Sequence, residues 1–394
     1  MKEMDDSLAR LERSLDSVEA WVEAHHYRGY EPFDGLTSYL FPLTFKNKLA
    51  CQVLQQGVRR FPINLRPILG IKALDSTKGR GYMAWGYLRR YQSSREELYK
   101  SKALALLEWL EANKSPHYAR HSWGNHFFYA SRGGFIRTHE STIVWTGLIG
   151  QAFLEAFKLF QLDPHRRVIE SIAEWMMALP REQTEQGLCL SYTMPHQVSI
   201  HNSNMIGSAF LAGAAKATGN QKYLDVAHQA MEYSCRRQLP DGAWYYGEDP
   251  KFHWIDAFHT GYNLDSLKRY IAASGDDSWA SHLQRGYEYF AQHFFEPGGR
   301  VKYYFNQAPP TDIQCASQAI DTLVFFSDTD PQALSVARRA AAWVADHMQA
   351  KDGHFYFRLY PFGIANKAPM IHWGQATMYK ALASLCKALD RIHS

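Results

Sequence analysis

The stretch that decides the fold is residues 241–267, DGAWYYGEDPKFHWIDAFHTGYNLDSL. It opens with an Asp-Gly turn, continues through the aromatic run 244–246, and then presents Asp256 and His259 at the predicted start of an apolar helix. A helix that only fills a core needs no such cluster of polar and aromatic residues at its start. Variants of this unit recur along the chain, so the stretch is one copy of a repeat.

The repeat comprises six segments that begin with polar residues and continue as apolar helices rich in small residues. They are 79–91, 138–153, 200–215, 258–271, 313–326 and 371–385. Their anchor residues recur 55–62 positions apart and are Arg80, His139, His201, His259, Gln314 and His372. Between them lie predicted amphipathic helices with charged faces, at 94–112, 165–179, 221–238, 277–294 and 331–349.

Each repeat is therefore predicted to be a helical hairpin with one buried and one half-exposed helix. Helices that are apolar on most sides belong in an inner layer, and six such hairpins are enough to close into a ring. The sequence predicts an all-α (α/α)6 toroid, a six-hairpin barrel, with the apolar helices inside. Short alternating segments in the loops before the inner helices predict β-hairpin loops on one face; examples are 187–194, 300–305 and 353–360.

The N-terminal region carries its own pattern. Apolar residues spaced by three and four positions over residues 4–24 predict an amphipathic helix. We interpret residues 1–28 as a capping helix packed on the body, and residues 29–394 as a single toroid domain.

Composition limits the classes of partner. The net charge is +4 over 394 residues, without a block of Lys and Arg, which argues against nucleic acid. The absence of a run of about 18 apolar residues predicts no membrane span. The N-terminus lacks an apolar signal core, and the five cysteines are scattered without a C-x-x-C pair, so we expect reduced thiols and a cytoplasmic location. The oligomeric state is left open.

The motifs of several cofactor and nucleophile chemistries are missing. The chain has no G-x-S-x-G, no phosphate-binding P-loop and no dinucleotide fingerprint. His117 and His121 have helical i, i+4 spacing, but no further residue completes a recognisable ligand set. We therefore expect neither a metal nor an organic cofactor.

The first candidate site is the loop 120–140. Here Asn125 and His126 are followed by Tyr129, a set that uronate lyases use to neutralise a carboxylate and move protons. Glu140 is a candidate catalytic carboxylate. The alternative is that the aromatic residues pack the loop while the histidines satisfy backbone groups. Further candidates for substrate contacts in this loop are Trp123, Arg137 and His139.

The second candidate site is the quoted stretch itself. Asp256 and His259 are spaced i, i+3 and share a helix face, so the carboxylate could orient the imidazole. Alternatively Asp256 is simply the helix N-cap, and both roles can hold together. Asp312 is a further candidate carboxylate at a predicted helix start. Candidate substrate-binding residues elsewhere are Arg80, Tyr82, His201, Asn204, Trp244, Tyr246, Trp254, Gln314, Gln318, His372 and Trp373.

Several of these segments resemble a known family. GYEPFDGL, RFPINLRPILGI, DGAWYYG, WIDAFHTGYNLDSL, PPTDIQCASQAIDTL and HWGQATMYKAL, with near-complete coverage of the chain, resemble bacterial and archaeal proteins found with exopolysaccharide and capsule biosynthesis genes. Some members carry the label delta-aminolevulinic acid dehydratase, which an all-helical repeat does not support. The chain departs from that family at His372, where an Arg is common.

The resemblance extends to larger toroid superfamilies. The fold looks like six-hairpin glycosidases and terpenoid cyclases, and WIDAFHTGYNLDSL is similar to the C-terminal toroid of glucuronyl C5-epimerases. It implies an oligo- or polysaccharide substrate and a role in polysaccharide biosynthesis.

Three functions follow as hypotheses. The first is a uronate C5-epimerase-like or lyase-like enzyme, with His259 or His126 as base, Tyr129 or Tyr246 as acid, and a carboxylate held by Arg80, Arg137 or Asn125. The second is a glycoside hydrolase or transferase using Glu140 with Asp256 or Asp312. The third is a non-catalytic glycan-binding protein of the export machinery.

Overall fold

The structure is a computed structural model that describes residues 2–131, 134–307 and 309–393. Within these residues twelve long helices form two layers, and the six inner helices contact one another in a closed ring, which confirms the (α/α)6 toroid. The inner helices are α3 (Thr77–Ser94), α5 (Ile143–Phe160), α7 (His201–Thr218), α9 (Ala257–Ser274), α11 (Ile313–Phe325) and α13 (Thr377–His393). The outer helices are α1 (Lys2–Ala24), α4 (Glu97–Ala112), α6 (Asp163–Met177), α8 (Gln221–Cys235), α10 (Ala280–His293) and α12 (Ala333–Met348).

The N-terminal helix α1 packs on the body at the outer-ring position between α12 and α4. Leu11, Leu15 and Val18 are buried, and Glu19 of α1 accepts from Lys102 of α4 at 2.7 Å. At the other side Arg10 pairs with an aspartate of α12. The helix from the start of the chain therefore closes the outer ring. The domain boundary between residues 28 and 29 remains a prediction.

A glycine turn after the outer helices sets the spacing between neighbouring hairpins. Gly242 follows α8 with φ +96°, and a Cβ there would lie 2.4 Å from the carbonyl oxygen of Arg285 on α10. Gly353 follows α12 with φ +99°, and its Cβ would lie 2.3 Å from the Ser17 carbonyl on α1. Only glycine permits both the positive φ and this approach. The same turn against the next outer helix occurs at Gly187 and Gly299.

The polar residues that start the repeats largely cap inner helices. The side chains of Ser76, Thr142, Asp256 and Asp312 accept hydrogen bonds from the first turns of α3, α5, α9 and α11. All inner helices begin at one face of the ring, which we call the mouth. The segment 138–153 is an exception, because α5 begins only after Thr142 and His139 lies outside it, in the left-handed region at φ +60°.

The strands are short and belong to loops at the mouth. The predicted strand within 187–194 forms at residues 187–190. The segment 300–305, which the sequence also predicted as a strand, is not one of the strands β1–β9 of the structure. Antiparallel pairs join β1 (Arg28–Gly29) to β2 (Leu74–Asp75), β3 (Tyr129–Ala130) to β4 (Phe135–Ile136), and β5 (Arg181–Thr184) to β6 (Gly187–Leu190). A three-stranded sheet runs in the order β7 (Thr311–Asp312), β8 (Arg358–Leu359) and β9 (Ala365–Asn366).

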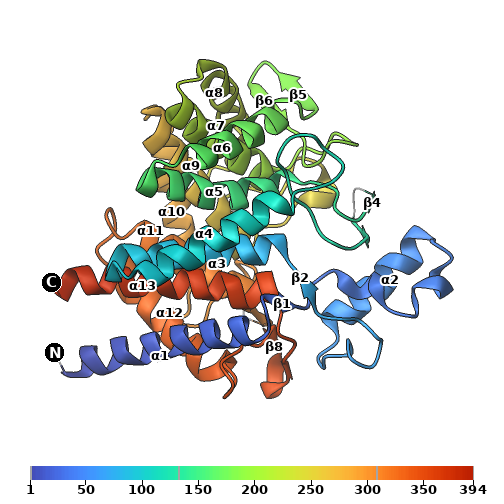
Figure 1. The fold of residues 1–394 in the computed structure, drawn as a ribbon, viewed down its shortest axis with the longest axis vertical. Coiled ribbons are helices and arrows are strands. Elements are labelled where there is room, and N and C mark those ends of the chain that lie inside the picture. The colour runs from blue at the N-terminus through green and yellow to red at the C-terminus, as the bar shows by residue number, and fades with distance from the viewer. Residues whose placement is uncertain (1, 132–133, 308, 394) are drawn as a thin grey trace.

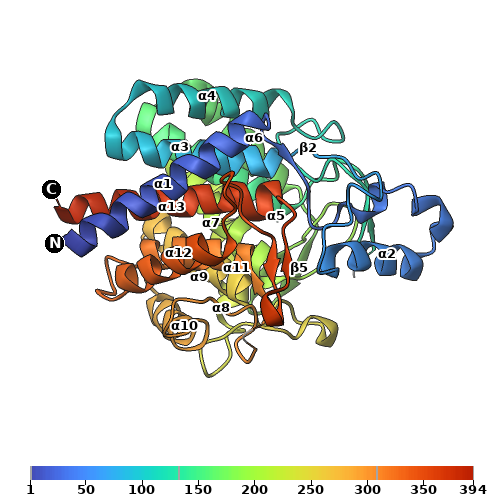
Figure 2. The ribbon, with the colours of Figure 1, turned by 90° about the horizontal axis from the view of Figure 1, so that it is seen from below.

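The chain between β1 and β2 makes a long excursion. It includes two short 3-10 helices, Asp34–Thr37 and Phe41–Thr44, and the helix α2 (Lys48–Arg60). Figures 1 and 2 show α2 projecting from the mouth side, away from both rings. The start of the excursion returns to the ring, because Tyr30 pairs with Met370 just before α13.

Within the described part of the chain, one helix has the length and hydropathy of a membrane span. It is α5, Ile143–Phe160, and more than half of its residues are buried in the ring. Because α5 packs between α3 and α7, its apolar character is explained by its place in the inner layer.

Candidate active site at the mouth of the ring

The pair Asp256 and His259 at the start of α9 forms as the spacing predicts. Asp256 Oδ1 accepts the His259 backbone N–H at 2.9 Å, and Oδ2 lies 2.7 Å from the imidazole Nδ1. Asp256 is therefore both the helix cap and the partner that orients the ring. With Nδ1–H directed at the carboxylate, Nε2 carries the lone pair. The His259 side chain retains 19% exposure at the mouth.

Aromatic rings surround His259. The Tyr246 ring centroid lies 4.5 Å from the imidazole, and Tyr246 stacks on Trp254 at 4.5 Å. Trp254 Nε1 donates to Asp256 at 3.1 Å, which adds a third bond to that carboxylate. On the inner side Phe258 lies 3.8 Å from His259 and 5.3 Å from Trp373 at the start of α13. An imidazole among apolar and stacking faces suits a sugar ring.

A second cluster lies at the starts of α3 and α13 and comprises Glu31, Lys78 and His372. All three side chains are buried. Glu31 contacts His372 Nδ1, and the His372 ring lies 4.8 Å from Trp145. The Lys78 Nζ lies 4.9 Å from the same indole ring. The excursion thus carries a carboxylate into the centre of the mouth.

Burial shifts the proton affinities in this cluster. It raises the pKa of Glu31 from 4.5 to about 7 and lowers the pKa of Lys78 from 10.5 to about 7. Burial, reinforced by the Lys78 charge, holds the pKa of His372 well below its ordinary value. Groups with proton affinities near neutrality can exchange protons at physiological pH, which is the property that acid–base catalysis requires.

The backbone at His372 departs from α-helical geometry. Residues 371–376 form a π-helical turn ahead of α13, with Trp373 at φ −84° and ψ +27°. Such turns are frequent at functional sites, since they re-aim side chains that a regular helix would point elsewhere. Here the turn places His372 against Trp145, and Trp373 against Asp312 and Phe258.

Asp312 is held in a closed network. Its oxygens accept from Arg358 Nε at 2.5 Å and from Trp373 Nε1 at 2.8 Å, besides capping α11. Because these donors engage both of its oxygens, we assign Asp312 to the structure of the mouth. Beside it, the Arg59 guanidinium of α2 lies 5.2 Å from the Trp373 ring centroid.

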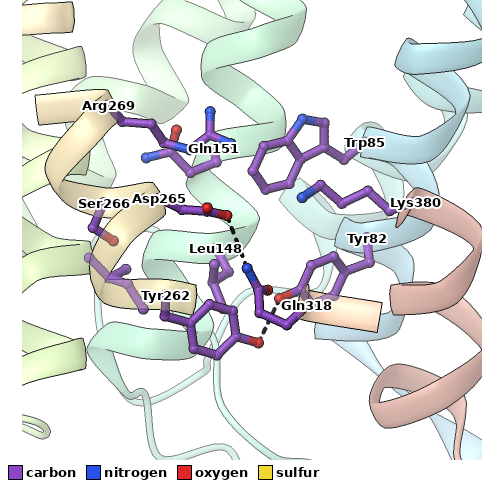
Figure 3. Close-up of a pocket in the computed structure, with 11 residues that line it drawn as sticks. Tyr82, Trp85, Leu148, Gln151, Tyr262, Asp265, Ser266, Arg269, Gln318 and Lys380 are labelled. Atoms are coloured by element: carbon purple, nitrogen blue, oxygen red, sulfur yellow. Dashed lines mark hydrogen bonds between the residues drawn. The ribbon is translucent and has the colours of Figure 1, made fainter. Parts of the chain in front are cut away.

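The ring axis below the mouth holds buried polar residues (Figure 3). Tyr82 and Tyr262 share a hydrogen bond of 2.9 Å, and Gln314 donates to Tyr262 at 2.9 Å. Gln318 donates to Asp265 at 3.0 Å. A cavity of about 20 Å³ lies among these side chains, which is room for one or two waters. Tyr82, Gln314 and Gln318 thus face the ring interior.

Charged side chains lie deeper on the same axis. Asp321 pairs with Lys380, and although burial would raise the pKa of Asp321, Lys380 outweighs it and keeps the pKa low. Burial and the neighbouring Asp321 raise the pKa of Asp265 to about 6. The Trp85 ring lies 3.8 Å from Lys380 Nζ. The cavity is too small for a sugar, so we assign this layer to structure.

Arg80 points out of the ring. Its guanidinium stacks 4.0 Å from Trp109 of α4 and pairs with Asp75. The ring-facing residues of α3 are Lys78, Tyr82 and Trp85, which are spaced four and three apart, whereas Arg80 is two residues out of phase. The expected clamp on a substrate carboxylate is therefore not placed in the mouth.

His201 and Asn204 of α7 face the outer ring. His201 lies 2.6 Å from Glu248 and 3.2 Å from Ser234 of α8. Asn204 donates to the Ala230 carbonyl at 2.7 Å and accepts from the Leu190 backbone. Both are buried and join the two layers, so the structure does not bring them to the mouth.

Trp123 and Trp244 occupy equivalent places in two repeats. Trp123 Nε1 donates to the Leu110 carbonyl at the end of α4, and Trp244 Nε1 donates to the Ser234 carbonyl at the end of α8. Both rings are fully or almost fully buried. They anchor the mouth loops to the outer helices and are not available for sugar stacking.

The loop 120–140 contributes less than expected. Glu140 accepts from Arg137 Nε at 2.5 Å and from Tyr118, and lies in a structural pair at the rim. His139 is exposed, with its backbone held by Asn125. The candidate carboxylate Glu140 and the candidate substrate contact Arg137 are thus paired with each other.

His126 and Tyr129 do reach the neighbourhood of the second cluster. Burial lowers the pKa of His126 to about 4, against the opposing effect of Glu31. The Tyr129 ring lies 5.9 Å from Phe33 of the excursion, and the Asn125 side chain hydrogen bonds to its hydroxyl. Burial raises the pKa of Tyr129 well above its ordinary value.

Sequence reasoning missed Glu31, Lys78 and Arg59. The spacing of Lys78 with Tyr82 and Trp85 was a usable signal, since it marks the inner face of α3. Glu31 lies in a part of the excursion that has no helical period. Arg59 lies in the last turn of α2, and the period of that helix does not show which part of the ring it contacts. Among the described residues no group of three or more His, Cys, Asp or Glu converges as a metal site.

Comparisons with known proteins agree on the fold. No protein-family model and no curated protein matches the sequence. Among solved structures, the chain is similar to a cellobiose 2-epimerase from Bacillus thermoamylovorans B4167, with 9% identity, TM-score 0.61, and coverage of 82% of this chain and 90% of that one.

Two further solved structures cover almost the whole chain. A polysaccharide lyase matches at 12% identity and TM-score 0.61, over 98% of this chain and 99% of that one. A glycoside hydrolase family 76 mannosidase, Bt3792 from Bacteroides thetaiotaomicron VPI-5482, matches at 12% identity and TM-score 0.62, over 99% and 100%. The chain thus has the six-hairpin glycosidase-like toroid fold.

Proposed function

We propose that the chain is a carbohydrate-processing enzyme that works by proton transfer at the mouth of the ring, in the manner of a uronate C5-epimerase or lyase. The observation that carries the proposal is His259, whose Nδ1 is bound by Asp256 while its ring lies against Tyr246 and Phe258 and stays partly exposed. This arrangement makes Nε2 a general base. The similar toroids include an epimerase and a lyase, which supports the same class of chemistry.

In this mechanism His259 would remove the proton beside a substrate carboxylate. Tyr246 is the nearest candidate acid, with its ring 4.5 Å from the imidazole. Return of a proton to the opposite face gives the epimer, whereas loss of the neighbouring glycosidic oxygen gives an unsaturated product. Arg59, whose Nε lacks a partner among the described residues, replaces Arg80 and Arg137 as the candidate for holding the carboxylate.

The arrangement of carboxylates at the mouth gives less support to the hydrolase alternative. Asp256, Asp312 and Glu140 are each held by several donors, so a paired-carboxylate mechanism would have to break one of these networks. Glu31, with a pKa near 7, is one protonated carboxyl that could serve as an acid. Membership in an exopolysaccharide biosynthesis family, a cytoplasmic location and the binding-only alternative remain proposals.

Incubation with glycans in D2O tests the proposal. The panel contains uronate polymers and neutral oligosaccharides, and the readouts are deuterium at the carbon beside the carboxylate, ultraviolet absorbance of an unsaturated product, and new reducing ends. Deuterium or unsaturated product, lost in His259→Gln, supports proton transfer. New reducing ends without deuterium support the hydrolase. Binding without any of the three readouts would support the binding protein.

A further inference from the structure

The excursion between β1 and β2 carries an exposed apolar surface. Of the 14 large hydrophobic side chains exposed among the described residues, eight lie within 39–68. Phe45 is 88% exposed, and Leu49 and Ile68 are 70% and 71% exposed. Isolated apolar side chains on a surface need no explanation, but a concentration in one projecting segment does.

One loop beside the excursion, the turn between β8 and β9, extends this surface. Tyr360 donates to the Arg60 carbonyl and Asn366 to the Phe61 carbonyl, which fixes the turn between β8 and β9 beside α2. Phe362 at that turn is fully exposed. We call residues 39–72, together with this turn, the apolar lobe.

The charged residues of the excursion part of the lobe are all basic. Residues 39–72 contain six Lys and Arg and no Asp or Glu. Arg66 is buried against Asp34 at 2.9 Å and Arg59 is half-buried. Four basic residues remain exposed around the apolar side chains: Lys46, Lys48, Arg60 and Lys72. Elsewhere the chain balances its charges, because the net charge of the whole is only +4.

We propose that the apolar lobe docks on the surface of an anionic lipid bilayer. Exposed aromatic and aliphatic side chains flanked by Lys and Arg are the features that seat a protein in the headgroup region, where the apolar groups enter the acyl boundary and the basic groups meet anionic lipid. A second protein copy would bring the same four cations together, which disfavours a symmetric dimer through this surface.

The lobe projects from the mouth side, beyond the starts of α3 and α13 (Figures 1 and 2). Docking would therefore turn the mouth toward the bilayer. The inference stands apart from the proposed reaction, because it rests on the exposed residues of the lobe, whereas the only lobe residue assigned to the site is the half-buried Arg59.

Vesicle co-sedimentation of the full chain tests the proposal. Wild-type protein is expected to bind phosphatidylcholine vesicles that contain phosphatidylglycerol, to bind phosphatidylcholine alone more weakly, and to release as salt rises. The double variant Phe45→Ser and Leu49→Ser should lower binding by about tenfold or more. The variant Lys46→Glu and Lys48→Glu should remove the preference for the anionic vesicles.

The matched control replaces two exposed apolar residues outside the lobe. Leu98→Ser and Leu162→Ser, at outer-ring positions, should bind like wild type. Circular dichroism melts of all variants verify folding. The proposal is overturned by a wild type that binds neither vesicle, by an equal loss in the control, or by ultracentrifugation that shows a dimer dissolved by Phe45→Ser and Leu49→Ser without vesicle binding.

Discussion

At the scale of single residues, Asp256 performs two tasks that the sequence left as alternatives. It caps α9 through one oxygen and orients the His259 imidazole through the other. Capping needs only an acceptor, whereas orientation of Nδ1–H and stabilisation of an imidazolium need the charge. The two tasks can therefore be separated by substitution.

Replacing Asp256 by Asn is expected to preserve the thermal midpoint while lowering kcat about tenfold or more, because Asn caps helices as well as Asp does. Asp256→Ala should also lose about 1 kcal/mol of unfolding free energy. Urea unfolding and deuterium exchange with the identified substrate measure the two effects. Unchanged kcat in Asp256→Asn would assign Asp256 to capping alone.

His259→Gln is expected to lower kcat by about 100-fold or more, as for the loss of a general base. Stability should change little, because the side chain retains 19% exposure. His347→Gln, at an exposed position of the outer helix α12 where the imidazole stacks on Trp343, is the control and should retain full activity. Retained activity in His259→Gln would remove this residue from the mechanism.

The cluster of Glu31 and Lys78 predicts a pH-dependent stability. Since the folded-state pKa of Glu31 is raised from 4.5 to about 7, the folded state keeps a proton that the unfolded chain releases, and stability falls as pH rises through that window. A shift of this size corresponds to about 3 kcal/mol. Glu31→Gln should flatten the fall.

Lys78 supplies the matched comparison above pH 7. Its folded pKa is lowered from 10.5 to about 7, so stability should rise with pH in that range, and Lys78→Met should flatten the rise. Urea unfolding across pH 4.5–10 measures both slopes. An unchanged profile in both variants would mean that these groups titrate alike in the folded and unfolded chain.

At the scale of the elements, the glycine turns fix the position of each hairpin relative to the next outer helix. The positive φ and the close carbonyl are both required at Gly353, which meets α1. Other glycines in the same region of φ, such as Gly275 after α9, have open space around them. Substitution of glycine by alanine should therefore lower the unfolding free energy more at Gly353 than at Gly275.

Gly353→Ala is expected to lower the unfolding free energy by about 3 kcal/mol or more, because its Cβ would meet the Ser17 carbonyl. Gly275→Ala should cost only about 1 kcal/mol, the strain of the left-handed conformation. Urea unfolding of both variants gives the comparison. Similar losses of unfolding free energy in the two variants would show that the close contact at Gly353 does not fix the position of α12 against α1.

At the scale of the whole molecule, the ring closes between its two ends. α1, from the start of the chain, packs beside α13, from its end, and Tyr379 donates to Glu19 at 2.8 Å. This contact spans 360 residues of sequence. Closure therefore depends on the N-terminal helix as much as on the repeats.

Deletion of residues 2–24 is expected to give an aggregated or molten chain, since it would expose the core that Leu11, Leu15 and Trp21 cover. Size-exclusion chromatography and near-ultraviolet circular dichroism measure this. As a control, a protease site between residues 25 and 28 should leave the nicked protein folded, with the helix bound. A folded, monomeric deletion variant would mean that α1 is dispensable to the ring.

The sequence by itself determined the number of hairpins, the division into inner and outer helices, and the Asp256–His259 pair, because all of these follow from local periodicity and short spacing. Only the tertiary structure decided which polar residues meet in the mouth. Glu31 and His372 lie 341 positions apart in the sequence and touch through ring closure, while Arg80 and His201 turn away because of helical phase. Contacts between distant segments depend on the packed ring, and no local pattern encodes them.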